Sequence, residues 1–136
     1  MTFVVDASVA LAWSLGDERS EAADAILERL AVEGAVVPAI WPFEVANGLR
    51  FAERRGRISM ADALRSALVL KALPIEVEPS DLEATLEGCA AIARRFDLSV
   101  YDAAYVRLAI RRRLPLATAD ERMRRACEDA GVELLD

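Results

Sequence analysis

Short apolar runs alternate with longer amphipathic stretches along this chain. The short runs are typical of buried strands, and they cover residues 2–6, 35–38, 75–77, 115–117 and 132–134. In the longer stretches apolar residues recur every three or four positions, which predicts helices over residues 8–15, 18–33, 42–55, 59–73, 80–96, 99–113 and 120–130. Strands that alternate with helices predict an α/β fold with a mostly parallel sheet of about five strands and helices on both faces.

Several residues mark where these helices begin. Pro42 fits the first position of a helix, where its missing N–H costs nothing. Ser80 and Glu83 have the spacing of a capping box, and so have Ser99 and Asp102. We therefore expect Ser80 and Ser99 to cap the helices that follow them.

Length and composition indicate one globular domain. The chain has 136 residues and is 54% hydrophobic, which suits a single domain over residues 1–136 and excludes a disordered chain. No apolar run approaches the ~20 residues of a membrane span, and the first residues lack a basic signal sequence. We expect a cytoplasmic protein with no membrane segment.

The residue types that are missing exclude several mechanisms. With no histidine, the chain can form no Ser-His-Asp triad, no Cys-His pair and no histidine-bearing zinc site. Cys89 and Cys127 are far apart in sequence and lack metal-binding spacing, so we expect two buried, reduced thiols on helices.

The charge pattern allows two interpretations. The net charge of −6 disfavours nonspecific binding of nucleic acid. Yet Lys71 is the only lysine, and many arginines are clustered, at residues 54–57, 94–95, 111–113 and 122–125. Arginine forks suit phosphate recognition, although such clusters are also typical of solvated helix faces.

Four acidic residues stand at predicted strand ends or helix starts: Asp6, Glu44, Asp102 and Asp120. In a parallel sheet this is the edge where ligands bind. Each acid alone also suits a helix cap or the first-turn dipole. Together they would repel one another unless a cation neutralised them, and Mg²⁺ or Mn²⁺ would do so while supporting phosphate-ester chemistry.

The ordered set of motifs resembles the PIN domain, most closely the bacterial VapC-type toxins of toxin–antitoxin pairs. The resemblance rests on residues 5–8, 44–47, 98–105 and 117–120, and spans nearly the whole chain. It implies a three-layer α/β sandwich and a Mg²⁺-dependent endoribonuclease that cleaves RNA, forms a homodimer and is inhibited by a cognate antitoxin. By position, the acidic quartet would be catalytic and metal-binding, Ser8 and Thr118 would be supporting hydroxyls, and Asn47 would lie beside the site.

Two arginine groups could hold the RNA backbone. Arg122 and Arg125 follow Asp120 within about a turn and a half of helix, whereas residues 111–113 end the helix that Asp102 begins, about 15 Å away at ~1.5 Å per residue. We expect Arg122 and Arg125 to contact phosphate. Four aromatic side chains could stack on bases, bind an antitoxin helix or belong to the core: Trp13, Phe51, Tyr101 and Tyr105.

Other functions fit less well. A receiver domain needs a paired acid near the first strand and a late lysine, and a haloacid-dehalogenase phosphatase needs an aspartate where Ser8 stands. Isolated glycines exclude a glycine-rich phosphate loop. The remaining alternative is a PIN-like module that acts by protein or RNA association without catalysis.

Overall fold

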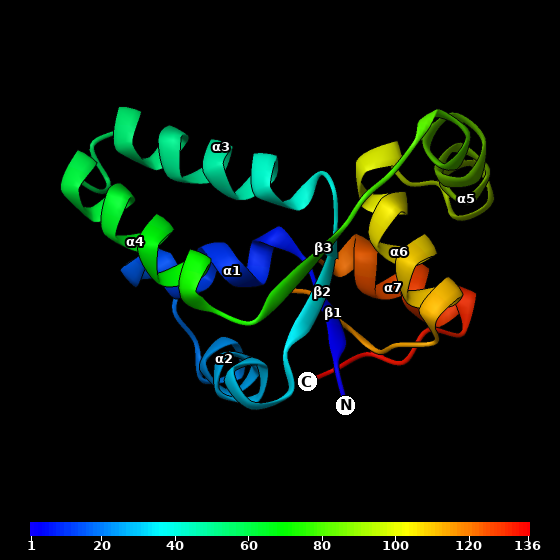
Figure 1. Cartoon of the computed structure of the whole chain (residues 1–136), viewed down its shortest axis with the longest axis horizontal. Helices are drawn as coiled ribbons and strands as arrows, with labels where there is room; N and C mark the ends of the chain where they lie inside the picture. The colour runs from blue at the N-terminus through cyan, green and yellow to red at the C-terminus, as the bar shows by residue number, and fades with distance from the viewer.

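A computed structural model describes all 136 residues and has four parallel strands at its centre (Figure 1). They are β1 (Phe3–Val5), β2 (Ala35–Pro38), β3 (Ile75–Glu78) and β4 (Leu116–Ala117), in the order β3-β2-β1-β4. Every pair is parallel. The α/β fold class is confirmed, and all carboxyl ends of the strands lie at one edge of the sheet.

Seven α-helices surround this sheet in two groups (Figure 1). The group on the left of the view comprises α1 (Ala7–Ser14), α2 (Glu21–Glu33), α3 (Trp41–Arg54) and α4 (Met60–Ala72). On the right lie α5 (Ala90–Phe96), α6 (Val100–Arg112) and α7 (Glu121–Ala130). Helices therefore cover the sheet from both sides, as the sequence predicted.

The predicted fifth strand is reduced to a single bridge. Leu134 pairs with Leu116 in parallel, supported by bonds from the Leu116 N–H to the Glu133 carbonyl (2.9 Å) and from the Leu135 N–H to the Leu116 carbonyl (3.0 Å). Because β4 is only two residues long, it offers too little backbone for a full strand beside it.

Serine side chains cap three of the seven helices, α2, α4 and α6. Ser59 and Asp62 form a reciprocal capping box at α4, and Ser99 accepts the Asp102 N–H at 3.1 Å to begin α6. The second helix begins later than predicted, because Ser20 is its cap and the 3₁₀ turn η1 (Gly16–Glu18) comes before it.

The prediction for Ser80 is wrong. Asp81 is the residue that accepts the Ala84 N–H, at 2.8 Å, while the Ser80 hydroxyl bonds to that of Thr85. From there the chain forms the π-helical turn η2 (Ala84–Cys89) before α5. Such turns are rare inside helices and are frequent at functional sites.

The core lies on both faces of the sheet. Phe3, Val4 and Val5 of β1 are fully buried, as a central parallel strand requires. Both cysteines are free and buried, as expected. No helix of the protein is long and apolar enough to span a membrane.

Candidate active site

The four predicted acids line one cavity of about 420 Å³ at the carboxyl edge of the sheet. Asp6 follows β1, and Asp120 follows β4 after a two-residue loop. Glu44 and Asp102 lie in the first turns of α3 and α6. Four segments far apart in sequence thus bring their carboxylates to one place, as the sequence predicted.

Asp6 is the most buried of the four, with 4% of its surface exposed. One carboxylate oxygen accepts the Ser8 hydroxyl at 2.6 Å and the Val9 N–H at 3.3 Å, and the other accepts the Thr118 hydroxyl. Burial raises the pKa of Asp6, and these three hydrogen bonds only partly oppose the rise. The structure therefore keeps a carboxylate where its charge is costly.

Ser8 and Thr118 each link Asp6 to the loop that carries Asp120. Ser8 Oγ accepts the Ala119 N–H at 3.1 Å, and Thr118 Oγ1 accepts the Asp120 N–H at 3.0 Å. Both hydroxyls donate to Asp6 and accept from the loop after β4. The supporting role predicted for them fits these contacts.

Glu44 is held by Tyr105, one of the aromatic residues considered above for base stacking or the core, in a contact that the sequence did not predict. The phenol of Tyr105 donates a 2.6 Å hydrogen bond to Glu44 Oε1 and is itself only 1% exposed. Burial is the main reason that the pKa of Glu44 is raised, and the bond from Tyr105 opposes the rise. Tyr105 follows Asp102 by three positions on one helix face, a spacing that could have suggested its role.

The negative charge of Asp120 affects the ionisation of Asp102. The pKa of Asp102 is raised first by burial and then by the charge of Asp120, and Arg122 acts in the opposite direction. Asp120 also caps α7, because its carboxylate accepts the Arg122 N–H at 2.9 Å. The structural role considered for Asp120 is therefore real, and it coexists with a place in the cavity.

The rest of the cavity wall comes mainly from α1 and α3. Asn47 lines it, as predicted, and Phe51 stands at the rim with 51% of its surface exposed. Gly48 lies against Leu11, where an added Cβ would meet the leucine methyl Cδ1 at 2.5 Å. A larger residue at position 48 would therefore displace the Leu11 side chain, a close approach of α3 to α1 that the sequence pattern did not reveal.

The donor set suits a hard divalent cation bound largely through water. The cavity is lined by four carboxylates and by no arginine or lysine. However, no group of three or more acidic or cysteine side chains is arranged closely enough to hold a metal ion directly. The arrangement fits Mg²⁺, which takes one or two carboxylates and keeps several waters.

The arginine groups differ in how they are paired. Arg111 and Arg112 bond to Glu78 (2.8 Å) and Glu76 (2.7 Å) on β3. Arg122 makes no side-chain ion pair and lies close enough to Asp102 to lower its pKa. In the group after Asp120, Arg124 pairs with Asp136, and Arg122 is left unpaired close to the cavity.

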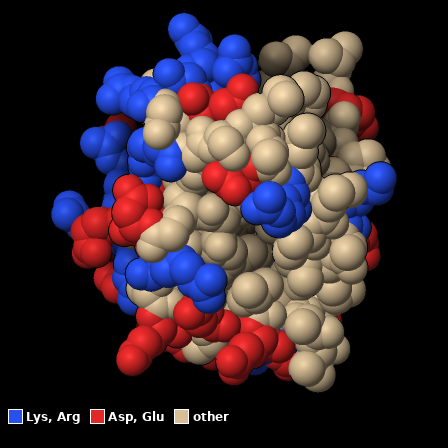
Figure 2. All heavy atoms as spheres, turned by 90° about the vertical axis from the view of Figure 1, so that its left-hand side faces the viewer, with Lys and Arg blue, Asp and Glu red and all other residues tan.

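The arginines around residues 54–57 lie at the far end of α3. Arg57 pairs with Asp17 at 2.7 Å, and the Arg55 guanidinium stacks over the Phe51 ring. Figure 2 shows basic and acidic side chains next to one another along the left side of that end of the molecule, and a mostly uncharged surface on the right. The mixture of signs there favours solvated helix faces over a continuous phosphate-binding surface.

Comparison with known proteins agrees with this geometry. The family model described as the PIN domain matches residues 3–129. The chain is 36% identical over 120 residues to Ribonuclease VapC9 of Mycobacterium tuberculosis and to VapC ribonuclease Mb0985 of Mycobacterium bovis, covering 88% of this chain and 87% of each relative.

Two solved structures share the fold. PAE2754 from Pyrobaculum aerophilum superposes with a TM-score of 0.72 at 23% identity, over 93% of this chain and 84% of the other. FitAcB from Neisseria gonorrhoeae gives 0.64 at 18% identity, over 100% of this chain and 97% of the other. Sequence, fold and acidic cavity together show that the chain belongs to the PIN-domain family, as a VapC-type member.

Proposed function

We propose that this protein is a Mg²⁺-dependent endoribonuclease. The observation that carries the proposal is the cavity where Asp6, Glu44, Asp102 and Asp120 meet with no basic side chain among them. Burial and mutual repulsion raise the pKa of three of these acids, and a bound cation would reverse that cost. The VapC relatives, which are named as ribonucleases, support RNA as the substrate.

Asp6 and Asp102 are proposed as the principal metal ligands. Asp6 is oriented by Ser8 and Thr118, and Asp102 extends from the first turn of α6. Glu44 and Asp120 would bind directly or through water, in keeping with the spacing of the four acids. When bound, Mg²⁺, or Mn²⁺ in its place, would ionise a water for attack on the phosphodiester and stabilise the charge that develops there.

The test is metal-dependent cleavage of single-stranded RNA by the wild type and by Asp102→Asn. The variant should lose about 10³-fold or more in rate, since groups that act as one catalytic unit fail together. Asp129→Asn is the control, because it removes the same charge from an exposed position on α7. Equal rates for Asp102→Asn and wild type would remove the basis of the proposal.

The alternative is a PIN-like module that binds protein or RNA without catalysis. Asp6 also caps α1 by accepting the Val9 N–H, but a cap does not require the acid to be buried beside three other carboxylates, so the burial of Asp6 counts against this alternative. RNA binding without cleavage in both Mg²⁺ and Mn²⁺ would favour this alternative.

We further propose that the protein is the toxin of a type II toxin–antitoxin pair, acting in the cytoplasm as a homodimer and inhibited by a cognate antitoxin. The VapC relatives support the toxin role. An exposed apolar stripe on α4, formed by Met60, Leu64 and Leu68, supports a protein partner, because soluble monomers rarely expose such patches.

A further inference from the structure

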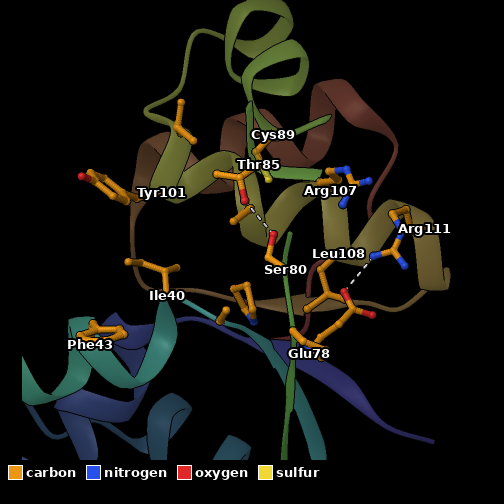
Figure 3. Close-up of a pocket in the computed structure, with 15 residues that line it drawn as sticks. Ile40, Phe43, Glu78, Ser80, Thr85, Cys89, Tyr101, Arg107, Leu108 and Arg111 are labelled. Carbon is orange, nitrogen blue, oxygen red and sulfur yellow. Dashed lines mark hydrogen bonds and ion pairs between the residues drawn. The ribbon is translucent and has the colours of Figure 1, made fainter. Parts of the chain in front are cut away.

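A second cavity, of about 330 Å³, lies on the other side of the helix starts that carry Glu44 and Asp102 (Figure 3). It is bounded by the start of α3, the end of β3, the turn η2 and α6. Its walls include Ile40 and Leu108, and the hydroxyls of Ser80 and Thr85 point into it. Its volume is in the range of small-ligand pockets.

The cavity contains an arginine with no partner. Arg107 is half-buried and makes no ion pair or hydrogen bond within the protein, whereas Arg111 on the same wall is bonded to Glu78 at 2.8 Å. The guanidinium of Arg107 lies against η2 at Gly88, where an added Cβ would meet its Nε at 2.5 Å. A half-buried cation without a partner is costly, so its position favours a ligand that offers acceptor atoms.

Two exposed aromatic rings stand on the opposite side of the cavity (Figure 3). Phe43 is 74% exposed and directly precedes Glu44, and Tyr101 is 61% exposed and directly precedes Asp102. Each ring is therefore one residue, or about 3.8 Å between Cα atoms, from an acid of the site. An RNA strand bound at the acids can reach these rings within one nucleotide. Exposed aromatic rings are the side chains on which unpaired bases stack.

We propose that this cavity receives an unpaired guanine of the RNA, next to the scissile phosphate. Phe43 and Tyr101 supply stacking surfaces, and the fork of Arg107 donates to O6 and N7 of the base, which is the commonest specific contact to guanine. The inference rests on the proposed nuclease function and adds the source of its sequence preference.

Two other occupants fit less well. A phosphate would meet apolar walls and the carboxylate of Glu78. A second copy of the chain would have to bring a carboxylate to Arg107 to pair its charge, whereas a guanine carries two acceptors of its own. A guanine combines the flat apolar ring and the paired acceptors that this cavity matches.

The experiment is a cleavage profile on an RNA pool that is randomised around the cut. With Mg²⁺, wild type should prefer guanine at one position beside the cleavage point. Arg107→Ala should reduce that preference about 5- to 150-fold, the range for losing one bidentate contact to a base. Arg107→Lys should lose it as well, because a point charge cannot replace the fork.

Gly88→Ala tests the geometry without removing the charge. Its methyl group would displace the flexible end of Arg107, so the guanine preference should fall as in Arg107→Ala. Arg95→Ala is the control, since this exposed arginine stacks on Phe96 away from the cavity. Arg95→Ala should keep the wild-type profile.

Binding measurements separate this inference from the nuclease proposal. Fluorescence anisotropy in the Asp102→Asn background would compare a labelled uridine tract with the same tract carrying one guanine. If the guanine-containing RNA binds more tightly, and if Arg107→Ala removes the difference, the guanine site is supported. This holds even if the wild type cleaves no RNA, a result that would refute only the proposed nuclease function.

Three results would overturn the inference. One is cleavage with no guanine preference, and another is a preference that survives both Arg107→Ala and Gly88→Ala. The third is a wild-type dimer in sedimentation that becomes a monomer on Phe43→Ser or Arg107→Ala, because the cavity would then be an interface between copies.

Discussion

Removing the hydroxyl of Tyr105 would test whether a tyrosine positions Glu44, one of the four acids of the proposed active site. Tyr105→Phe keeps the ring in the core, where the residue is 1% exposed, and deletes only the 2.6 Å hydrogen bond to Glu44. Burial holds the pKa of Tyr105 far above its ordinary value, so the phenol stays protonated and donates throughout the working pH range.

The expected cost follows from the type of hydrogen bond. A bond to a charged group contributes about 1.5–3 kcal/mol to stability, and the lower value applies here because Glu44 is only half-buried and water can replace the donor. For a chain of this size, about 1.5 kcal/mol corresponds to a fall of about 5 °C in melting temperature. Tyr101→Phe is the matched control, because its ring is exposed and its hydroxyl bonds to nothing in the protein.

The pH dependence of activity should also depend on the hydrogen bond from Tyr105 to Glu44. The hydrogen bond from Tyr105 lowers the pKa of Glu44, so its loss raises that pKa further and Glu44 takes up a proton at higher pH. The acidic limb of the kcat/KM profile should therefore move to higher pH in Tyr105→Phe. The reasoning fails if the melting temperature falls no more than in Tyr101→Phe, or if the acidic limb does not move.

Three more predictions follow from the cavity and its surroundings. Induced expression of the wild type should arrest growth while Asp102→Asn should not, and equal growth curves would count against a nuclease toxin. Mg²⁺ should raise the melting temperature more at pH 7.5 than at pH 5. Acids whose pKa is raised by folding destabilise the metal-free protein when they are ionised, and the protein regains that stability when they are protonated. A rise that does not depend on pH, or one that Asp102→Asn retains, would refute this. Arg122→Ala with Arg125→Ala should reduce the salt slope of RNA binding by about 1.4, at ~0.7 per contact, and an equal reduction by Arg112→Ala with Arg113→Ala would place the RNA elsewhere.

The fold could be predicted largely because its signals are local. A capping serine such as Ser59 and apolar strands such as β1 are features of a few neighbouring residues, and the alternation of strands and helices then implies a parallel sheet. The clustering of the four acids followed from that sheet, since the carboxyl ends of parallel strands share one edge. The sequence did not predict that the last strand is reduced to a single bridge, because its length depends on how many residues of β4 are available to pair with it.

What the sequence missed depends on partners far along the chain. Tyr105 bonds to Glu44 across 61 positions, and Gly48 lies against the side chain of Leu11, 37 positions earlier. Arg107 looked like any helix arginine until the structure placed it against η2 without a partner. Such roles come from tertiary contacts, which neither periodicity nor composition encodes.

The pairing of the arginines suggests how an acidic protein could hold RNA. Those paired with acids, such as Arg57, Arg111 and Arg112, are already neutralised. Arg122 and Arg107 have no such partner. Arg122 lies beside the acidic cavity, and Arg107 lies in the second cavity. The acidic cavity beside Arg122 is lined by carboxylates that repel phosphate. A divalent cation bound there would therefore strengthen RNA binding, so the metal would contribute to affinity as well as to chemistry.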